Sequence, residues 1–532
     1  MVQTLRLEEI MKRRKQLFFL GLLLSCMIAL CACSGSTENE GNDQKGAENG
    51  EASKNGGSVI VGITNDLDSL DPHKAVAAGT KEVLFNIFEG LVKPDKDGNL
   101  VPAVASDYKI SEDGMTYTFL LREGVKFHNG ALVTVDDVIY SLKRATGLLE
   151  TSDPEVRVES VFSCVDSIEA ITTEDGKQGV EVKLKEPNIE LLSYFTISII
   201  PKDYTEQATK PIGTGPFRFI SYSPMVSIVM EKNPDYYVEG VPYLDEVTFK
   251  ISANTDAAFM ELRAGTIDIF QQLTYEQANQ LRDLYNIEVG NMNLVQGIFL
   301  NHKAAPFDNL KVRQALCYAI DRQMILDIVA GGSGTIIGSN MFPGFGKYYD
   351  ETLASYYTYD IEKAKQLLNE AGYPDGFHFT ITVPSNYQAH VDTAQVIVEQ
   401  LKKVGITAEI KLVEWASWIS DVYKERNYEA TIVGLDSNLS PSDVVKRYVS
   451  TARNNFLNYS NEEFDKLYQE AYASVKEEEK VELYHQLQKI LTEDVASVYI
   501  QDPANLVAVN KKLAGYQFYP VYVQDMSTVY YK

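Results

Sequence analysis

The sequence predicts an α/β fold for the part of the chain that begins near residue 58. The main evidence is a strand, a helix and a second strand within about 38 residues, which is the length of a βαβ unit. Apolar residues alternate in the two expected strands and recur with helical spacing between them: Phe377, Phe379, Ile381 and Val383, then Val396, Ile397, Leu401 and Val404, then Ala408, Ile410 and Leu412. Gly405 ends the expected helix, and the crossover makes the two strands parallel.

Two further helices are expected before this unit. Asp308 can cap a helix whose buried face is formed by Val312, Ala315, Leu316, Ala319 and Ile320, and Gly331-Gly332 ends it. Asp360 can cap the next helix, which Gly372 and Pro374 close.

The first half of the chain reads mainly as strands. Ser58–Ile63 is a short apolar strand, and Thr116–Leu121 and Val180–Leu184 alternate as half-buried strands do. A helix is expected over Asp136–Arg144, and Asn233-Pro234 indicates a turn.

The N-terminal segment has the pattern of a secretory signal. Lys12–Lys15 is basic, Leu17–Leu30 is an apolar run of 14 residues, and small residues precede Cys33. A membrane-spanning helix needs about 20 residues, so this run favours an exported protein. Leu30-Cys31-Ala32-Cys33 resembles a bacterial lipobox, which implies that Cys33 is lipidated and becomes the first residue; the alternative is an ordinary cleaved signal.

The ends of this segment carry two further expectations. Glu8 and Glu9 are unusual in a basic signal head, so we expect translation to begin at Met11. Residues 33–57 are polar and almost without apolar side chains, which predicts a flexible tether whose r.m.s. span is about 25–30 Å.

Charge excludes one large class of function. The chain has a formal net charge of −25, and −28 from Cys33 onward, because five basic and two acidic residues precede it. Such a surface repels phosphate groups, so nucleic-acid binding is excluded.

We expect no disulfide framework from the cysteines. Cys26, Cys31 and Cys33 belong to the export segment, which leaves Cys164 and Cys317 in apolar patterns of the folded part. We expect two buried free thiols, and one bond between them is the alternative.

Many short motifs, in register from about residue 58 to the end, carry a resemblance to one family. The motifs are Ser69-Leu-Asp-Pro-His-Lys74, Asn86-Ile-Phe-Glu-Gly-Leu91, Ser111–Phe119, Leu121–Gly130, Gly213-Thr-Gly-Pro-Phe217, Asn233-Pro-Asp-Tyr-Tyr237, Pro306–Leu316, Ala319-Ile-Asp-Arg322 and Ala371–Phe377. The chain thus resembles the extracellular solute-binding proteins of family 5, the oligopeptide- and dipeptide-binding lipoproteins of ABC importers.

The resemblance implies a two-lobed periplasmic-binding-protein-like (type II) fold with an additional small inserted domain. By position, residues 1–32 are the signal peptide, 33–57 the lipidated tether, 58–80, 206–296 and 500–532 lobe I, 81–205 the inserted domain and 297–499 lobe II. The chain would cross between the lobes near 297–301 and 498–501, and these crossings would form the hinge.

The resemblance also implies ligand-binding segments. In this family main-chain groups pair with an extended peptide, and the first such segment would be Ala77, Ala78 and Gly79. The same alanines suit plain packing equally well. Trp415 would be an aromatic platform for ligand, with core packing as the alternative.

The second segment, Gly434–Pro441, departs from the pattern of peptide binders. They typically read Gly-Trp-x-Ala-Asp, with the Asp neutralising the peptide ammonium, whereas here Leu435 replaces the Trp and Asn438 stands at the Asp position. Asp436, two residues earlier and on the same face of an extended strand, can take over this role. No carboxylate-reading Arg can be assigned, and Arg447 and Arg453 suit surface ion pairs.

Signals for catalysis or metal binding are missing from the sequence. The six histidines show no metal-ligand spacing, and neither a phosphate-binding loop nor a calcium loop is present. We therefore expect no enzyme, no cofactor and no metal.

The sequence predicts a monomeric substrate-binding lipoprotein on the extracytoplasmic face of the cell membrane, which captures oligopeptides or dipeptides and delivers them to ABC importer permease subunits. Alternatives are the same fold binding another solute such as an oligosaccharide, a peptide-signal sensor and, least favoured, an exported hydrolase.

Overall fold

The computed structural model describes residues 54–149, 153–437 and 439–532. Cys33 and Asn438, and all but the last four residues of the expected tether, lie outside the described residues. Within the described ranges, no helix has the length and apolar character needed to cross a bilayer.

The described chain contains runs of consecutive strands in its first half and a more regular succession of helices and strands after β13. The helices are α2 (Ala78–Leu84), α3 (Val135–Thr146), α4 (Thr255–Ala264), α5 (Tyr275–Leu281), α6 (Leu310–Ala319), α7 (Arg322–Ala330), α8 (Ile361–Glu370), α9 (Gln388–Leu401), α10 (Trp415–Ser417), α11 (Pro441–Lys446), α12 (Glu462–Ala473) and α13 (Glu477–Glu493). Shorter helical turns are η1 (Ser160–Cys164), η2 (Glu190–Thr196), η3 (Pro343–Tyr348), η4 (Glu351–Ser355), η5 (Lys402–Val404) and η6 (Trp418–Lys424).

The strands form one large sheet and three small ones. The strands are β1 (Ser58–Ile63), β2 (Val92–Pro94), β3 (Leu100–Pro102), β4 (Ala105–Ile110), β5 (Thr116–Leu121), β6 (Val165–Thr172), β7 (Gln178–Leu184), β8 (Phe217–Ser223), β9 (Ser227–Lys232), β10 (Glu246–Ile251), β11 (Ile269–Phe270), β12 (Tyr285–Asn291), β13 (Val295–Leu300), β14 (Gly334–Ile336), β15 (His378–Pro384), β16 (Thr407–Val413), β17 (Ala430–Leu435), β18 (Val498–Asn510), β19 (Leu513–Ala514) and β20 (Tyr530–Tyr531).

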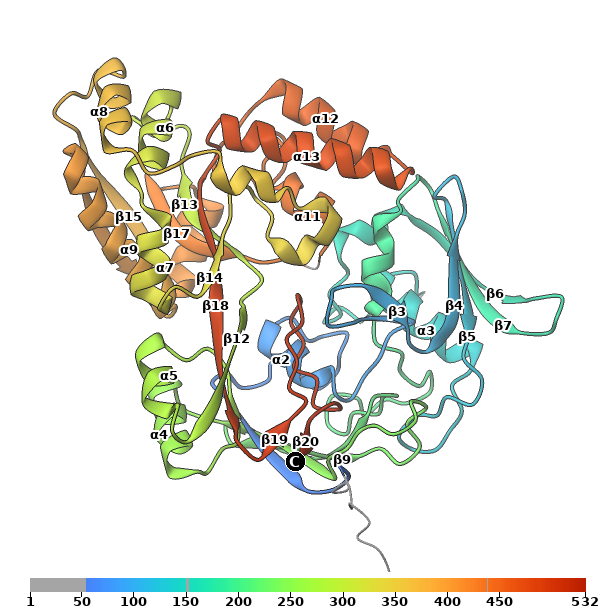
Figure 1. The fold of residues 1–532 in the computed structure, drawn as a ribbon. Helices are drawn as coiled ribbons and strands as arrows, with labels where there is room; N and C mark the ends of the chain where they lie inside the picture. Colours follow the sequence, from blue (N-terminus) through green and yellow to red (C-terminus); the bar gives the residue numbers. More distant parts are fainter. Residues whose placement is uncertain (1–53, 150–152, 438) are drawn as a thin grey trace, which may run out of the picture. The chain divides into compact units, whose positions relative to one another are not determined.

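Strand β18 joins the two parts of the large sheet, whose path runs β16-β15-β17-β13-β18-β11-β1-β10-β9-β8. Its first residues pair with β13 and β14, and its last residues pair with β12 and β11. Figure 1 shows β18 in red, running from the strands β13 and β17 down to β12. Residues 297–300, expected as a crossing, lie inside β13, and the link from β12 to β13 is residues 292–294.

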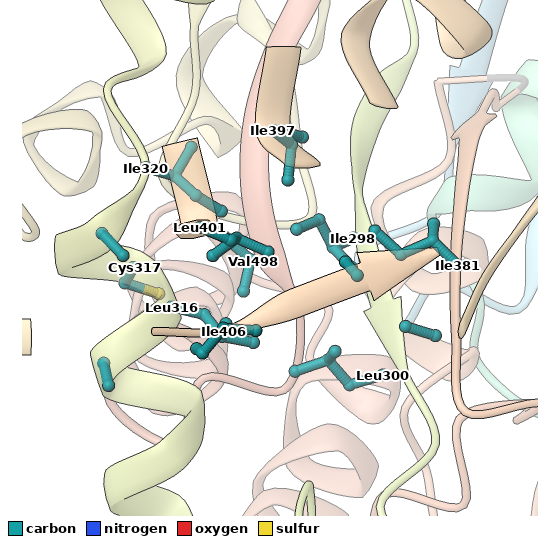
Figure 2. Close-up of a cluster of buried hydrophobic side chains, with 14 of the residues drawn as sticks. Ile298, Leu300, Leu316, Cys317, Ile320, Ile381, Ile397, Leu401, Ile406 and Val498 are labelled. Atoms are coloured by element: carbon teal, nitrogen blue, oxygen red, sulfur yellow. The ribbon is translucent and has the colours of Figure 1, made fainter. Parts of the chain in front are cut away.

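The predicted βαβ unit is confirmed. β15 and β16 pair in parallel, α9 connects them, and Gly405 ends the crossover with a left-handed φ of 83°. Side chains from β13, β15, α6 and α9 form one buried cluster, part of which Figure 2 shows around Ile298, Ile381 and Leu401. Cys317 lies in this cluster, and the expected free thiols are confirmed: Cys164 and Cys317 are buried and unbridged.

The strands and the helix expected in the first half are also confirmed. β1 and β5 have the predicted bounds, β7 begins two residues early, and α3 extends the expected helix at both ends. Four antiparallel strands form a separate sheet in the order β4-β5-β7-β6, which lies wholly between residues 81 and 205. Figure 1 shows these four strands together.

The helix expected from residue 308 to 330 is in fact two. Asn309, not Asp308, caps α6, because its side chain accepts the Lys311 N–H. Ile320 is extended, and Asp321 starts α7 by accepting the Met324 N–H. The apolar pattern continues across the break because residues of both helices, from Val312 to Ile325, pack into the same core.

A buried acid in β18 gives a prediction for pH dependence. Asp502 has no exposed surface, and its carboxylate accepts the Leu294 N–H at 3.2 Å. Burial raises the pKa of Asp502 to about 8, whereas an Asp in an unfolded chain has a pKa of about 3.9. The native state therefore binds more protons between these values, and the free energy of unfolding falls as pH rises from about 4 to about 8.

Asp502→Asn should remove this dependence, because the amide oxygen keeps the Leu294 bond without a charge. At pH 8 the free energy of unfolding of the variant should exceed that of the parent by at least about 1.4 kcal/mol, the equivalent of one pKa unit. The gain should shrink at pH 5. Denaturant unfolding at pH 5 and at pH 8 measures this gain, with the exposed Asp375→Asn as the control. An equal effect of Asp502→Asn at the two pH values would refute the account.

Candidate functional site

Three parallel strands bring one group of residues to the same edge of the sheet. β15 pairs in parallel with both β16 and β17, so their carboxyl ends lie side by side. Tyr387 follows β15, Trp415 follows β16 and Asp436 follows β17. Ligands of open α/β sheets bind outside this edge, which makes it the candidate site.

Trp415 is exposed to solvent, as a residue that serves as an aromatic platform for ligand must be. Its side chain is 39% exposed, so it is not a core residue. One ring face stacks on buried Trp418, with centroids 5.0 Å apart and planes 4° from parallel. Tyr387, itself 43% exposed, packs edge-on against Trp415 at 5.5 Å. The two rings form a rigid aromatic surface with a polar tip.

The backbone of Gly434 is already engaged. Its N–H donates to Nε2 of His390 at 3.0 Å, and its strand position pairs with Gln296 of β13. A Cβ there would lie 2.7 Å from the end of the Leu294 side chain and 3.0 Å from Cε1 of His390, so these side chains would have to shift to admit it. Gly434 and the half-buried Leu435 therefore shape the end of β17.

Asp436 is held from two sides. Its carboxylate accepts a hydrogen bond from the Tyr522 hydroxyl, and Nη2 of Arg447 donates to its backbone carbonyl at 2.7 Å. Arg447 therefore positions this segment through a backbone carbonyl, whereas a surface ion pair was expected for it. Burial, then the charge of Asp436, raises the pKa of Tyr522, so its hydroxyl stays a donor.

Acidic groups dominate the surroundings of Tyr522. Half-buried Glu82 accepts a hydrogen bond from Nε2 of Gln271 at 2.7 Å, and burial raises its pKa to about 7. The charge of Glu82 contributes to the raised pKa of Tyr522. Asp436 thus gives the site its acidic character, and Glu82, whose pKa is about 7, adds a partial negative charge near neutral pH.

The first expected segment is largely helical. Ala77 is the extended residue before α2, and its N–H donates to Oδ2 of Asp68 at 3.0 Å. Ala78 and Gly79 form the first turn of α2, so they do not offer a strand-like edge. A Cβ on Gly79 would meet nothing within 4 Å, so this side of the turn is open.

A pocket of about 340 Å³ lies beside α2. Residues of α2, the β2–β3 hairpin and η2 line it, and Leu439 and Tyr522 border it. Its volume falls at the lower end of the range for small-molecule sites, about 300–1,000 Å³. Tyr522 thus connects the pocket with Asp436 at the sheet edge.

The sequence missed four residues of this region. Tyr387 and His390 follow a strand whose parallel pairing was predicted, so the shared carboxyl edge was the available signal. Arg447 was assigned to the surface. Tyr522 belongs to the C-terminal segment, and no local pattern relates it to Asp436. In the described ranges, no three His, Cys, Asp or Glu side chains are arranged to hold a metal ion.

Comparisons with known proteins show which protein family the chain resembles. The model of the bacterial extracellular solute-binding proteins, family 5 Middle, matches residues 99–456. The oligopeptide-binding protein AppA of Bacillus subtilis is 28% identical over 540 residues, covering 96% of this chain and 97% of AppA.

Two solved structures extend the likeness to the fold. The periplasmic binding protein DppA of Helicobacter pylori, in complex with the peptide STSA, has a TM-score of 0.73 and 27% identity. AgaA of A. tumefaciens R10, in complex with agropinic acid, has a TM-score of 0.71 and 27% identity. Each comparison covers 90% of this chain and 99% of the other.

These likenesses confirm the predicted two-lobed type II periplasmic-binding-protein fold with its small antiparallel insertion. They also confirm the prediction that the protein is not an enzyme. The chain belongs to family 5 of the bacterial extracellular solute-binding proteins, the extracytoplasmic solute-binding components of ABC transporters.

Proposed function

We propose that this protein captures peptides between its two lobes and delivers them to a membrane permease. The observation that carries the proposal is that Tyr387, Trp415 and Asp436 each follow a strand end at one edge of the sheet, with both rings exposed. A carboxylate there can pair with the peptide ammonium, and charge-assisted hydrogen bonds are about twice as strong as neutral ones. Asp436 then neutralises the peptide ammonium, which the uncharged Asn438 at the usual Asp position cannot do.

The lobes in this proposal are residues 58–80, 206–296 and 500–532, and residues 297–499, with 81–205 inserted. The bond from Tyr522 to Asp436 supports this arrangement, because it joins the first lobe to the second beside the proposed ligand. β18 and residues 292–294 connect the lobes and serve as the hinge.

Ligand shifts such a hinged protein toward its closed form by binding that form better, and the permease reads closure. We further propose that Cys33 carries the lipid anchor and that residues 34–57 tether the lobes to the membrane. Both features keep captured peptide near the permease.

Two of the three relatives named above support peptides as the ligand. AppA is named for oligopeptides and DppA was solved with a tetrapeptide, whereas AgaA was solved with agropinic acid. The acidic site and the aromatic surface favour a ligand with a free amino group.

A thermal-shift screen of the purified protein tests the proposal. A mixed peptide pool should raise the melting temperature, because a ligand at 100 times its Kd adds about 2.7 kcal/mol to the free energy of unfolding. A matched oligosaccharide pool should leave it unchanged. Stabilisation by oligosaccharides alone would refute peptide capture, and mass spectrometry of co-purified ligand gives an independent check.

A further inference from the structure

The lining of the pocket beside α2 combines buried apolar side chains with buried polar ones. Leu84, Phe88 and Phe162 are among its buried apolar residues. Glu89 and His73 also line it, and their exposures are only 4% and 8%. Such a combination suits an apolar group that ends in a polar atom.

Two buried acceptors of these lining residues lack hydrogen-bond partners among the described residues. Among the described residues, nothing hydrogen-bonds to Oε2 of Glu89 or to Nδ1 of His73. One peptide group contacts both residues: the Ser198 carbonyl accepts from Nε2 of His73 at 2.8 Å, and the Ile199 N–H donates to the Glu89 backbone carbonyl at 2.8 Å. Buried polar atoms normally have partners, so these two indicate a missing group.

The missing group must be a hydrogen-bond donor. Nε2 of His73 faces the carbonyl of Ser198, so Nε2 carries the proton. Burial lowers the pKa of His73 to about 4, which keeps the ring neutral at pH 7 and leaves Nδ1 as an acceptor. Oε2 of Glu89 is an acceptor as well.

The charges around the pocket favour an uncharged donor. Oε1 of Glu89 already pairs with Lys93 at 2.8 Å, and Arg157 pairs with Glu159 at 3.1 Å. Lys81 adds a third cation to the lining. A cationic ligand group would be repelled by Lys81, Lys93 and Arg157. The two carboxylates nearby, Glu89 and Glu159, already pair with Lys93 and Arg157.

We propose that this pocket is a specificity subsite for a neutral ligand side chain that ends in a hydrogen-bond donor, such as the indole of tryptophan, the hydroxyl of tyrosine or the carboxamide of glutamine. The inference rests on the proposed function, because the side chain belongs to the captured peptide. The apolar lining side chains hold the stem, and Glu89 and His73 accept from its tip.

Tryptophan is the sharpest probe, since its indole N–H only donates. Calorimetric titration would compare tetra-alanine peptides that carry tryptophan or 2-naphthylalanine at each position in turn. At one position the tryptophan peptide should bind about tenfold more tightly, the effect of one hydrogen bond to a charged acceptor. In Glu89→Gln this ratio should fall to about one, because the amide turns its N–H₂ toward the pocket while its oxygen stays with Lys93.

Glu409→Gln is the matched control, because Glu409 is 73% exposed on β16, far from the lining residues in sequence, and should keep the tenfold ratio. Should Glu89→Gln not fold, Thr196→Phe decides, because Thr196 is an exposed lining residue and a ring there fills the pocket. That variant should weaken the tryptophan peptide more than tetra-alanine.

The inference would be overturned if the parent protein bound the tryptophan and 2-naphthylalanine peptides equally at every peptide position. It would also be overturned if Glu89→Gln left the affinity ratio unchanged, or if Thr196→Phe weakened the tryptophan peptide and tetra-alanine equally. Peptides that bind without this discrimination would leave the proposed function intact. Failure of every peptide to bind would overturn both.

Discussion

Replacing Lys480 with methionine should lower the free energy of unfolding by about 3–5 kcal/mol, the usual cost of breaking a buried ion pair from one side. The Lys480 side chain has no exposed surface, and its Nζ lies 3.0 Å from Oε1 of Glu190, which is 6% exposed. Without the ammonium group, a carboxylate would remain buried without its counter-charge.

The surroundings of Glu190 explain why it cannot simply turn toward water. Tyr484 donates to Oε1 at 2.5 Å, while the Ser440 hydroxyl and the Ser442 N–H donate to Oε2 at 3.0 Å and 2.9 Å. These bonds tie η2 to α13, to the end of the segment Gly434–Pro441 and to the first turn of α11. The loss should therefore appear as global destabilisation.

Denaturant unfolding of Lys480→Met measures this loss. Lys466→Met is the matched control, because Lys466 is 81% exposed and its partner Glu470 is 3.6 Å away on the same helix; about 0.5 kcal/mol or less is expected. Adding Glu190→Gln to Lys480→Met should recover part of the loss, since no unpaired charge then remains. A Lys480→Met variant within 1 kcal/mol of the parent would contradict the account.

Asp436→Asn should weaken peptide binding by about 10- to 100-fold, the effect of losing a hydrogen bond to a charged group. The amide can still accept from the Tyr522 hydroxyl, so the local structure should persist. It can no longer neutralise the peptide ammonium. Titration calorimetry with a tetrapeptide from the stabilising pool gives the ratio of Kd values.

Asp375→Asn controls for the change in net charge. Asp375 is exposed and precedes β15, so it lies toward the amino end of the strand, opposite the edge that carries the site. This variant should bind as the parent does. Equal affinities of Asp436→Asn and the parent would remove Asp436 from the site.

Local sequence pattern was sufficient for much of the fold. β1, β5 and the βαβ crossover follow from alternation, helical spacing and a single glycine, because each depends on neighbours close in the chain. The break at Ile320–Asp321 was missed because both helices bury their apolar residues in one core, which hides the boundary. Asp308 and Asn309 are both good capping residues, and local sequence does not rank them.

The site was predictable only in part, for a related reason. Trp415 follows a predicted strand and Asp436 was reached through the family resemblance, whereas the residue that bonds the Asp436 carboxylate comes from a distant segment. Tyr522 lies 86 residues from Asp436, and Lys480 lies 290 residues from Glu190 in the chain. Such contacts are set by how the sheets and the inserted segment meet, which no local pattern records.

The central claim is that the acidic sheet edge reads the amino end of a peptide, and calorimetric titration of the parent protein with one tetrapeptide in two forms tests it most directly. The form with a free amino terminus should bind at least about tenfold more tightly than its N-acetylated form, because acetylation removes the charge that Asp436 pairs with. Equal affinity of the two forms would contradict the account.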